Sequence, residues 1–401
     1  MALLSVDDAL ARILDDARPI GSERVSLTEA AHRILAEEAA AKLTQPPFDA
    51  SAMDGYAVRA ADVASVPAVL TLIGEARAGQ AFGGTVGQGQ CARIFTGAPV
   101  PAGADTVVIQ ETTKADGNAI AFLEPAAAGA NIRPRGGDFD NGQVLLLPGR
   151  VLDARAILLA AAMGHGTLEV RRKPVVAVLA TGDELVEPGQ RPGPGQIVSS
   201  NPYGLAAMIA AAGGAPRLLG IAADTREALE AKIAAASDAD VLVTLGGASV
   251  GDHDLVLPVL KARGVMIDFW KIAMRPGKPM LFGRLNGQRI LGLPGNPVSA
   301  MVCARVFLVP LIERLLGKPP ALTAPIKARL TQPMKANADR LHYMRATMER
   351  DAAGALHVTP QASQDSSLTR VLAVSNALIV AAINAPALPA GSEVDVLPLD
   401  F

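Results

Sequence analysis

Cysteine, histidine and aromatic residues are scarce in this chain. Its 401 residues include two cysteines, Cys91 and Cys303, five histidines, one tryptophan and three tyrosines. Two cysteines so far apart in sequence exclude a disulfide framework and a zinc ribbon, and they fit a reducing compartment. No histidine has a second histidine or a cysteine at the spacing of metal ligands, so we interpret the histidines as structural or solvated.

An excess of charge of either sign is also missing. The chain has 37 Lys and Arg against 39 Asp and Glu, a formal net charge of −2. No general positive field exists to hold nucleic acid or an acidic membrane, so an anionic substrate needs a local basic cluster. The first 17 residues are acidic and amphipathic, unlike a signal peptide, and apolar runs such as 206–212 are too short to span a bilayer. We therefore expect a cytoplasmic protein without nucleic-acid or membrane partners.

The length and the hydrophobic content, 50% of residues, predict two to four domains. Leucines and isoleucines at helical spacing in 3–14 and 27–35 predict a helical region over 1–45, which we group with 130–172. Within that second part Asp153 is a good N-cap for a helix over 154–163. Short apolar runs separated by Gly and Pro predict a small β domain over 46–129.

Residues 173–318 alternate strands with helices, which predicts a doubly wound α/β domain with a largely parallel sheet. The expected strands include 175–180, 241–245 and 290–293, and the expected helices are 203–212, 255–263 and 298–316. Short strands and Pro/Gly turns over 319–401 predict a small β-barrel or sandwich. The fold class is therefore multi-domain α/β.

Five segments that we expect to cross the sheet end in glycines, carboxylates or basic residues. They deliver TGDE at 181–184, Asp224, GGASVGDHD at 246–254, RPGKP at 275–279 and PGNPVS at 294–299. Ligands of open α/β sheets bind beyond the carboxyl ends of the strands. Five such loops at one edge favour a bound ligand over ordinary turns.

One group of these loops suits an anion. Asn296 is a good N-cap, Pro297 fits the first helical position, and Ser299 brings a hydroxyl to the first turn. Lys278, between a glycine and a proline, adds a compact positive charge. Asn296 acting only as a helix cap is the simpler alternative. The Gly-Lys pair lacks the spacing of a Walker A loop.

The other group suits a metal ion. Glu184, Asp224 and Asp254 offer hard carboxylate oxygens of the kind that Mg²⁺ takes together with substrate phosphates. Two plainer alternatives remain open: Asp254 as the N-cap of the next helix, and Gly246-Gly247 as a tight turn. An anion site beside a magnesium site predicts phosphate or phosphoanhydride chemistry.

Several segments resemble the molybdopterin molybdenumtransferases, the family that includes MoeA and the gephyrin E domain. PFDASAMDGYA at 47–57 matches its N-terminal signature. RIFTGAPVP at 93–101 with GAD at 103–105, TGDE at 181–184, SVGDHD at 249–254, PGKP at 276–279 and LPGNPVS at 293–299 match further blocks in order. The resemblance covers essentially the whole chain from about residue 20.

The resemblance implies a set of site residues. Asp54 and Thr96 fall on active-site positions of the second domain, and Glu184, Asp224 and Asp254 fall on acidic positions of the α/β domain, which is MogA-like in this family. Lys278, Ser299, Arg345 and Ser375 match molybdate-binding positions. Arg275 stands where the family often has Lys, which keeps the charge but changes its geometry. The implied substrate-binding positions also include Gly246, Gly247, Ser249, Pro294, Gly295, Asn296 and Pro297.

The family resemblance implies insertion of molybdate into adenylylated molybdopterin, with Mg²⁺-dependent release of AMP. It also implies a homodimer that builds each site from both chains, and partners in a molybdopterin adenylyltransferase and molybdoenzyme chaperones. Two rivals are a molybdopterin adenylyltransferase, which the α/β region alone resembles, and a non-enzymatic gephyrin-like scaffold. The segment SAMDGY at 51–56 argues against the first, and the lack of a fused adenylyltransferase domain with a long linker argues against the second.

Overall fold

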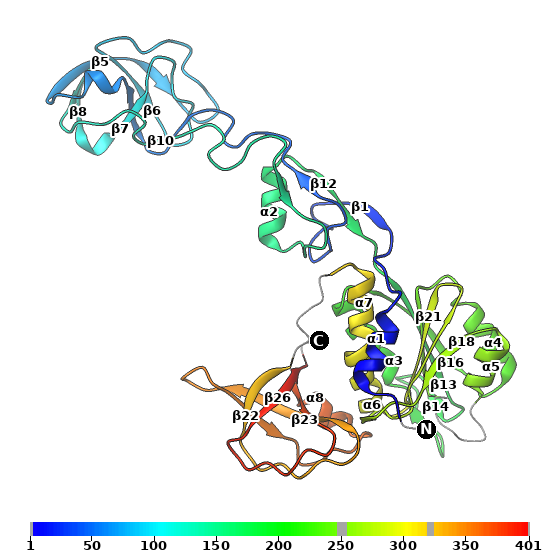
Figure 1. Cartoon of the computed structure of the whole chain (residues 1–401). Coiled ribbons are helices and arrows are strands. Elements are labelled where there is room, and N and C mark those ends of the chain that lie inside the picture. Colours follow the sequence, from blue (N-terminus) through cyan, green and yellow to red (C-terminus); the bar gives the residue numbers. More distant parts are fainter. Residues whose placement is uncertain (1–2, 247–254, 319–324, 400–401) are drawn as a thin grey trace. The chain divides into compact units, whose positions relative to one another are not determined.

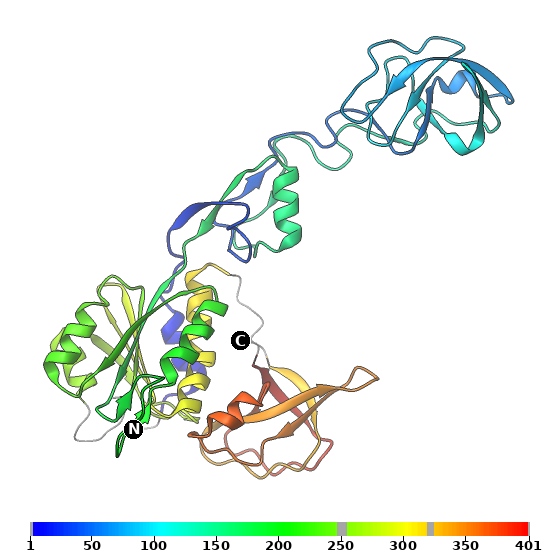
Figure 2. The same cartoon turned by 180° about the vertical axis from the view of Figure 1, so that it is seen from behind.

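A computed structural model describes residues 3–246, 255–318 and 325–399, which form two compact units (Figures 1 and 2). Unit 1 comprises Met1–Glu23, His32–Ala36 and Val170–Phe401, and unit 2 comprises Arg24–Ala31 and Glu37–Glu169. The strands β1 (Ser22–Ser26) and β12 (Thr167–Arg171) each contain a boundary between the units.

The α/β part of unit 1 is built on a six-stranded sheet in the order β16-β13-β17-β21-β20-β18. Neighbouring strands are parallel from β16 to β21, whereas β20 is antiparallel to both β21 and β18. Because two reversals cancel, β18 runs in the same direction as the parallel strands. The predicted doubly wound, largely parallel sheet is confirmed, and the antiparallel β20 was not predicted. The strands are β13 (Val175–Thr181), β16 (Ala215–Ala222), β17 (Val241–Leu245), β18 (Met266–Trp270), β20 (Leu281–Leu285) and β21 (Gln288–Leu293).

Helices cover both faces of this sheet, as its continuous apolar strands require. Val176 and Val178 of β13 face a core shared with α1, α3, α6 and α7, while Ala177 and Leu179 face a second core with α4 and α5. Figure 1 shows these two groups of helices on opposite sides of the sheet. The helices are α1 (Val6–Leu14), α3 (Asn201–Ala211), α4 (Arg226–Ala234), α5 (Val256–Ala262), α6 (Pro297–Cys303) and α7 (Val309–Leu315).

The helix expected over 298–316 is present, with one irregularity. Between α6 and α7 the chain widens into a π-helical segment, Ala304–Leu308. Cys303, which ends α6, is fully buried.

The C-terminal part of unit 1 is a closed barrel of five strands. The pairs run β23-β24-β22-β26-β25, and an antiparallel pair between β25 and β23 closes the ring. The short β19 (Met274–Arg275) joins β23 in parallel, which ties the α/β part to the barrel. The β-barrel expected at the C-terminus is thus confirmed. Its elements are β22 (Ile326–Leu330), β23 (Leu341–Arg350), β24 (Leu356–Pro360), α8 (Thr369–Ala373), β25 (Ala377–Ala381) and β26 (Glu393–Pro398).

Unit 2 contains a six-stranded β sheet and one α-helix, α2 (Ala154–Ala162). The Asp153 carboxylate accepts a hydrogen bond from the N–H of Ala156, so the expected N-cap is confirmed. The sheet order is β7-β4-β6-β5-β9-β8. These strands are β4 (Gly55–Val58), β5 (Ala68–Ala76), β6 (Gln90–Ile94), β7 (Thr106–Ile109), β8 (Thr113–Asp116) and β9 (Ala119–Phe122), accompanied by the short strands β2 (Ala39–Ala40), β3 (Ala50–Ser51), β10 (Ile132–Arg133) and β11 (Val144–Leu146).

The prediction of a second N-terminal helix over 27–35 is wrong. Residues 22–26 form β1, and the following segment is a series of turns. His32 has a left-handed backbone with φ of 62°, which an α-helix cannot contain. The apolar residues Ile34 and Leu35 are buried as the pattern required, each with 1% exposure, but through turns rather than through a helix.

Candidate functional site

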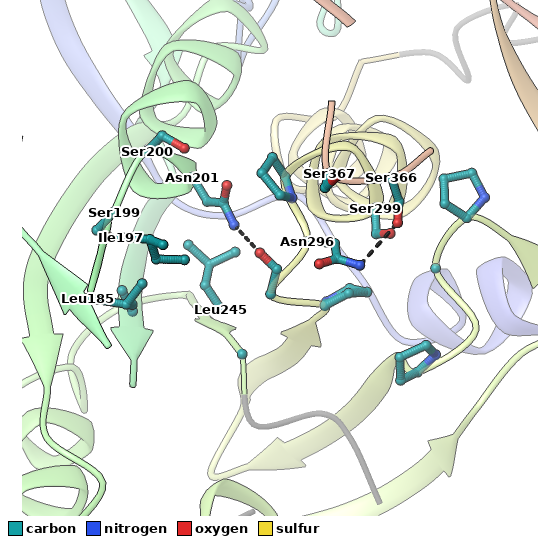
Figure 3. Close-up of a pocket in the computed structure, with 18 of the residues that line it drawn as sticks. Leu185, Ile197, Ser199, Ser200, Asn201, Leu245, Asn296, Ser299, Ser366 and Ser367 are labelled. Carbon is teal, nitrogen blue, oxygen red and sulfur yellow. Dashed lines mark hydrogen bonds between the residues drawn. The ribbon is translucent and has the colours of Figure 1, made fainter. Parts of the chain in front are cut away.

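A pocket of about 960 Å³ lies at the carboxyl ends of the parallel strands in unit 1 (Figure 3). Loops that follow β13, β17, β19 and β21 line it, together with a polar segment of the barrel, residues 364–367. The strand-end position follows the rule for open α/β sheets. The predicted site residues that line the pocket are Glu184, Gly246, Arg275, Lys278, Pro294, Gly295, Asn296, Pro297 and Ser299.

Asn296 and Asn201 join the pocket loops rather than cap helices. Asn296 occupies the N-cap position of α6, but its side chain makes no capping bond, and its Nδ2 donates to Ser366 Oγ at 3.0 Å. Asn201, at the start of α3, donates from Nδ2 to the Gly295 carbonyl at 2.6 Å. The capping role considered for the Asn296 side chain is therefore wrong, and both amides fix the loop after β21.

The start of α6 is completed by the barrel. The N–H of Val298 donates to the Ser366 carbonyl at 3.1 Å, so one donor of the first turn is satisfied by a segment distant in sequence. Ser299, in the same turn, lines the pocket with 5% exposure. The hydroxyl of Ser299 and the positive end of the helix dipole both favour a negatively charged ligand here.

A basic loop borders the same end of the pocket. Arg275 and Lys278 are exposed and line it, as does Arg340 from the barrel. Gly277 between them has φ of 110°, and a Cβ atom at this position would lie 2.4 Å from Cys303 Sγ. Only glycine therefore fits where the loop crosses the end of α6.

Arg345 is fully buried behind this end of the pocket. Its Nη2 donates to the Asp365 carbonyl at 3.3 Å, while Nε and Nη1 have no hydrogen-bond partner among the described residues. Burial lowers the pKa of Arg345 to about 10, and the charge of Arg275 adds to this shift. Burial, followed by the charges of Arg275, Arg345 and Arg340, also lowers the pKa of His342 to about 4, so that imidazole is neutral at pH 7. Arg345 is therefore a buried positive charge beside the pocket with two free donors, and the negative charge of Asp365 only partly opposes the lowering of its pKa.

The acidic residues form a second feature. Asp224 follows β16, and its N–H donates to Asp183 Oδ1 at 3.0 Å. Burial raises the pKa of Asp224, the negative charge of Asp183 raises it further, and Glu184 adds a smaller contribution. Of the acidic site residues, Glu184 lines the pocket and Asp224 does not. Such mutual repulsion fits a cation, although residues 3–246, 255–318 and 325–399 bring no three acidic, His or Cys side chains together as a metal site. Asp254, Gly247 and Ser249 lie outside the described residues.

Asp54 and Thr96 meet in unit 2. Asp54 Oδ1 accepts hydrogen bonds from the Thr96 backbone N–H at 2.8 Å and from its hydroxyl at 2.7 Å. These two bonds lower the pKa of Asp54, and the nearby charge of Arg93 adds to the effect. Asp54 is thus a carboxylate held in a fixed orientation.

Some predicted residues lie elsewhere and some lining residues were missed. Ser375 does not line the pocket, and its Oγ donates to the Val371 carbonyl at 2.7 Å. Arg345 lies behind the pocket wall rather than in it. Arg340 and the barrel segment 364–367 also line the pocket and were not predicted. The polar sequence QDSS was the available signal for the segment.

The pocket and the sheet define a class of protein, an α/β protein whose strand-end pocket is suited to an anionic ligand. Family models match three consecutive parts of the chain. They are the MoeA N-terminal region (domain I and II) at 4–164, a probable molybdopterin binding domain at 177–314 and the MoeA C-terminal region (domain IV) at 327–399.

Curated relatives agree with these models. The chain is 36% identical to a molybdopterin molybdenumtransferase of Haemophilus influenzae, over 99% of both chains. It is 41% identical to one from a Nostoc species, over 74% of this chain and 70% of the relative. Two solved structures of a molybdopterin biosynthesis MoeA protein from Pyrococcus horikoshii have TM-scores of 0.87 and 0.82, with 30% and 28% identity. They cover 100% and 98% of this chain, and this chain covers 100% and 99% of them.

The chain belongs to the MoeA family of molybdopterin molybdenumtransferases. It is accordingly a transferase of molybdenum cofactor biosynthesis. In the part of the chain that the structure describes, no helix is both long enough and apolar enough to cross a membrane.

Proposed function

We propose that this protein inserts molybdate into adenylylated molybdopterin, with Mg²⁺-dependent release of AMP. The observation that carries the proposal is the buried guanidinium of Arg345 beside the pocket, with two nitrogens that lack hydrogen-bond partners among the described residues. The loops of the same pocket also bring Ser299, Lys278 and Glu184. An anion end and a carboxylate in one pocket suit a reaction between a free oxyanion and a second substrate that carries a phosphoanhydride.

Molybdate is a tetrahedral dianion, so its site needs donors from several directions and at least one full positive charge. Ser299 supplies a hydroxyl at the start of α6, and Lys278 and Arg275 supply positive charges from the basic loop. Arg345 is buried behind the pocket lining and adds a fixed positive potential. The low dielectric constant of the protein interior strengthens this potential. These groups would hold molybdate next to the two dithiolene sulfurs of molybdopterin. They would promote the reaction chiefly by keeping the two substrates close together.

Glu184 and Asp224 would hold Mg²⁺, together with Asp254, which lies outside the described residues. The raised pKa of Asp224 supports this assignment, because a bound cation offsets the repulsion among Asp183, Glu184 and Asp224. When held by these carboxylates, Mg²⁺ would neutralise the charge of a phosphoanhydride. We further propose that Asp54, kept charged by its bonds to Thr96, takes part in the reaction.

In the proposed reaction, two sulfurs of the molybdopterin dithiolene bond to molybdenum. Two oxygens of molybdate leave as two waters, which take the two thiol protons and two further protons from solvent. A further water cleaves the anhydride, which yields AMP and the phosphate of the finished cofactor. The adenylylated substrate requires an adenylyltransferase to supply it, and molybdoenzyme chaperones would accept the product.

The test is to incubate the protein with adenylylated molybdopterin, molybdate and Mg²⁺ and to measure AMP. We expect release that needs all three components and stops when EDTA removes the metal. Release of AMP without molybdate, or none with it, would overturn the proposal. Formation of adenylylated molybdopterin from ATP and molybdopterin would instead favour the adenylyltransferase alternative.

A further inference from the structure

One side of the pocket is aliphatic, and the anion end does not account for it. Figure 3 shows Leu185, Ile197 and Leu245 on one side of the pocket and Asn296, Ser299 and Ser366 on the other. We name Leu185, Ile197 and Leu245 the aliphatic wall. Ile197 is a large apolar residue of this wall and is 58% exposed.

The aliphatic wall is held in place before any ligand arrives. Leu185 in β14 (Leu185–Val186) pairs in parallel with Ile197 in β15 (Ile197–Val198). The N–H of Ile197 donates to the Glu184 carbonyl at 2.8 Å, which joins the wall to the carboxylate side of the pocket. Where β14 ends, Glu187 accepts a hydrogen bond from the Tyr203 hydroxyl of α3 at 2.8 Å.

We propose that the aliphatic wall binds the flat face of a fused nitrogen heterocycle of the substrate, with Ile197 as its principal contact. The polar edges of such a ring remain free to bond while its apolar face covers exposed methyl groups, which water solvates poorly. A ligand that places its ring on the wall and its anionic groups toward Ser299 matches both sides of the pocket. This inference rests on the proposed function, whose substrate carries two such rings, a pterin and an adenine.

The contact exists equally before and during the reaction, so it affects binding rather than the chemical rate. For Ile197→Ser we expect KM for adenylylated molybdopterin to rise about tenfold, the scale of losing one or two methylene contacts. The value of kcat and the molybdate concentration for half-maximal rate should stay within about twofold. Ile197→Leu should restore most of the affinity.

Leu218→Ser is the matched control. Leu218 is an aliphatic residue of the edge strand β16, 41% exposed, and it does not line the pocket. We expect this variant to keep the wild-type KM. An equal loss in both variants would mean that a general effect on the fold, rather than contact with a ring, explains the change, and would overturn the inference.

Separate equilibrium titrations with AMP and with molybdopterin identify the ring. The ligand whose dissociation constant rises about tenfold in Ile197→Ser is the one whose ring lies on the wall. If neither constant changes, or the wild-type protein binds neither ligand, the inference is wrong. If the wild-type protein releases no AMP, the proposed function fails, whereas the two titrations still decide whether the wall binds a ring.

Discussion

At the scale of single residues, the pocket depends on charges with few internal partners. Arg345 is the extreme case, because its guanidinium is buried and two of its nitrogens lack partners within the described ranges. Lys278 is exposed and lines the pocket on the loop that contains Gly277. Its charge therefore carries little cost in desolvation free energy. These two residues should therefore respond differently to substitution.

Arg345→Met should leave stability unchanged or raise it, while the molybdate requirement rises by at least about tenfold. A buried charge costs desolvation energy that an apolar side chain does not, and apolar replacement of buried ion pairs is often neutral or stabilising by about 1–4 kcal/mol. Urea unfolding and AMP-release kinetics measure the two effects. A large loss of stability would mean that the bond from Arg345 to the Asp365 carbonyl matters more than the buried charge.

Lys278→Ala should raise the molybdate concentration needed for turnover far more than it weakens molybdopterin binding. The ammonium is one of the positive charges assigned to the dianion, and its loss removes an electrostatic contact worth about tenfold or more. Lys261→Ala, on the exposed surface of α5 outside the pocket, is the control. If molybdopterin affinity collapses and the molybdate requirement does not change, Lys278 serves the other substrate.

Asp224→Asn should cut Mg²⁺-dependent AMP release by at least about tenfold, and Asp254→Asn should act in the same direction. Because the pKa of Asp224 is raised, its carboxylate gains a proton at a higher pH than an ordinary aspartate as the pH falls. The Mg²⁺ concentration required should therefore increase as the pH falls toward that pKa. Asp183→Asn removes the charge that most raises this pKa and should shift the onset to lower pH. An unchanged Mg²⁺ requirement in Asp224→Asn would exclude it as a ligand.

At the scale of elements, the loop from β19 to β20 is fitted to the end of α6. Gly277→Ala places a Cβ against Cys303 Sγ and forces a left-handed backbone on alanine. We expect a loss of at least about 1 kcal/mol in the free energy of unfolding, together with a higher molybdate requirement. Adding Cys303→Ala should recover only part of the stability, since the backbone strain remains. A double-mutant cycle of urea unfolding measures how much of the lost stability Cys303→Ala recovers.

The elements predicted correctly are those whose signal lies in neighbouring residues of the sequence. The apolar run of β13 and the Asp153 cap of α2 carry their own signals, and both are present. The false helix over 27–35 had a helical spacing of apolar residues, but the left-handed His32 interrupts it. The antiparallel β20 and the barrel segment 364–367 depend on partners far away in sequence, which periodicity does not reveal. For the same reason, residue spacing did not show that Arg345 is buried behind the pocket wall.

At the scale of the whole molecule, we expect a homodimer in solution. The resemblance to the MoeA family implies this state. The substitutions at Asp224, Lys278 and Arg345 are therefore to be tested in the assembled protein. Light scattering at micromolar concentration should give twice the chain mass of 41.2 kDa. A stable species of 41.2 kDa at that concentration would contradict the prediction.

Ser366 of the barrel hydrogen-bonds to Asn296 and Val298 at the start of α6, and these bonds form late in synthesis on the ribosome. Asn296 and its partner Ser366 are 70 positions apart in the chain. The sheet and its helices emerge first, and domains commonly fold as they emerge. The start of α6 and the loops around it gain their last hydrogen bonds only after most of the barrel has been translated. A nascent chain that stalls before residue 366 therefore holds a folded α/β part with an unfinished pocket, so binding competence arrives late in translation.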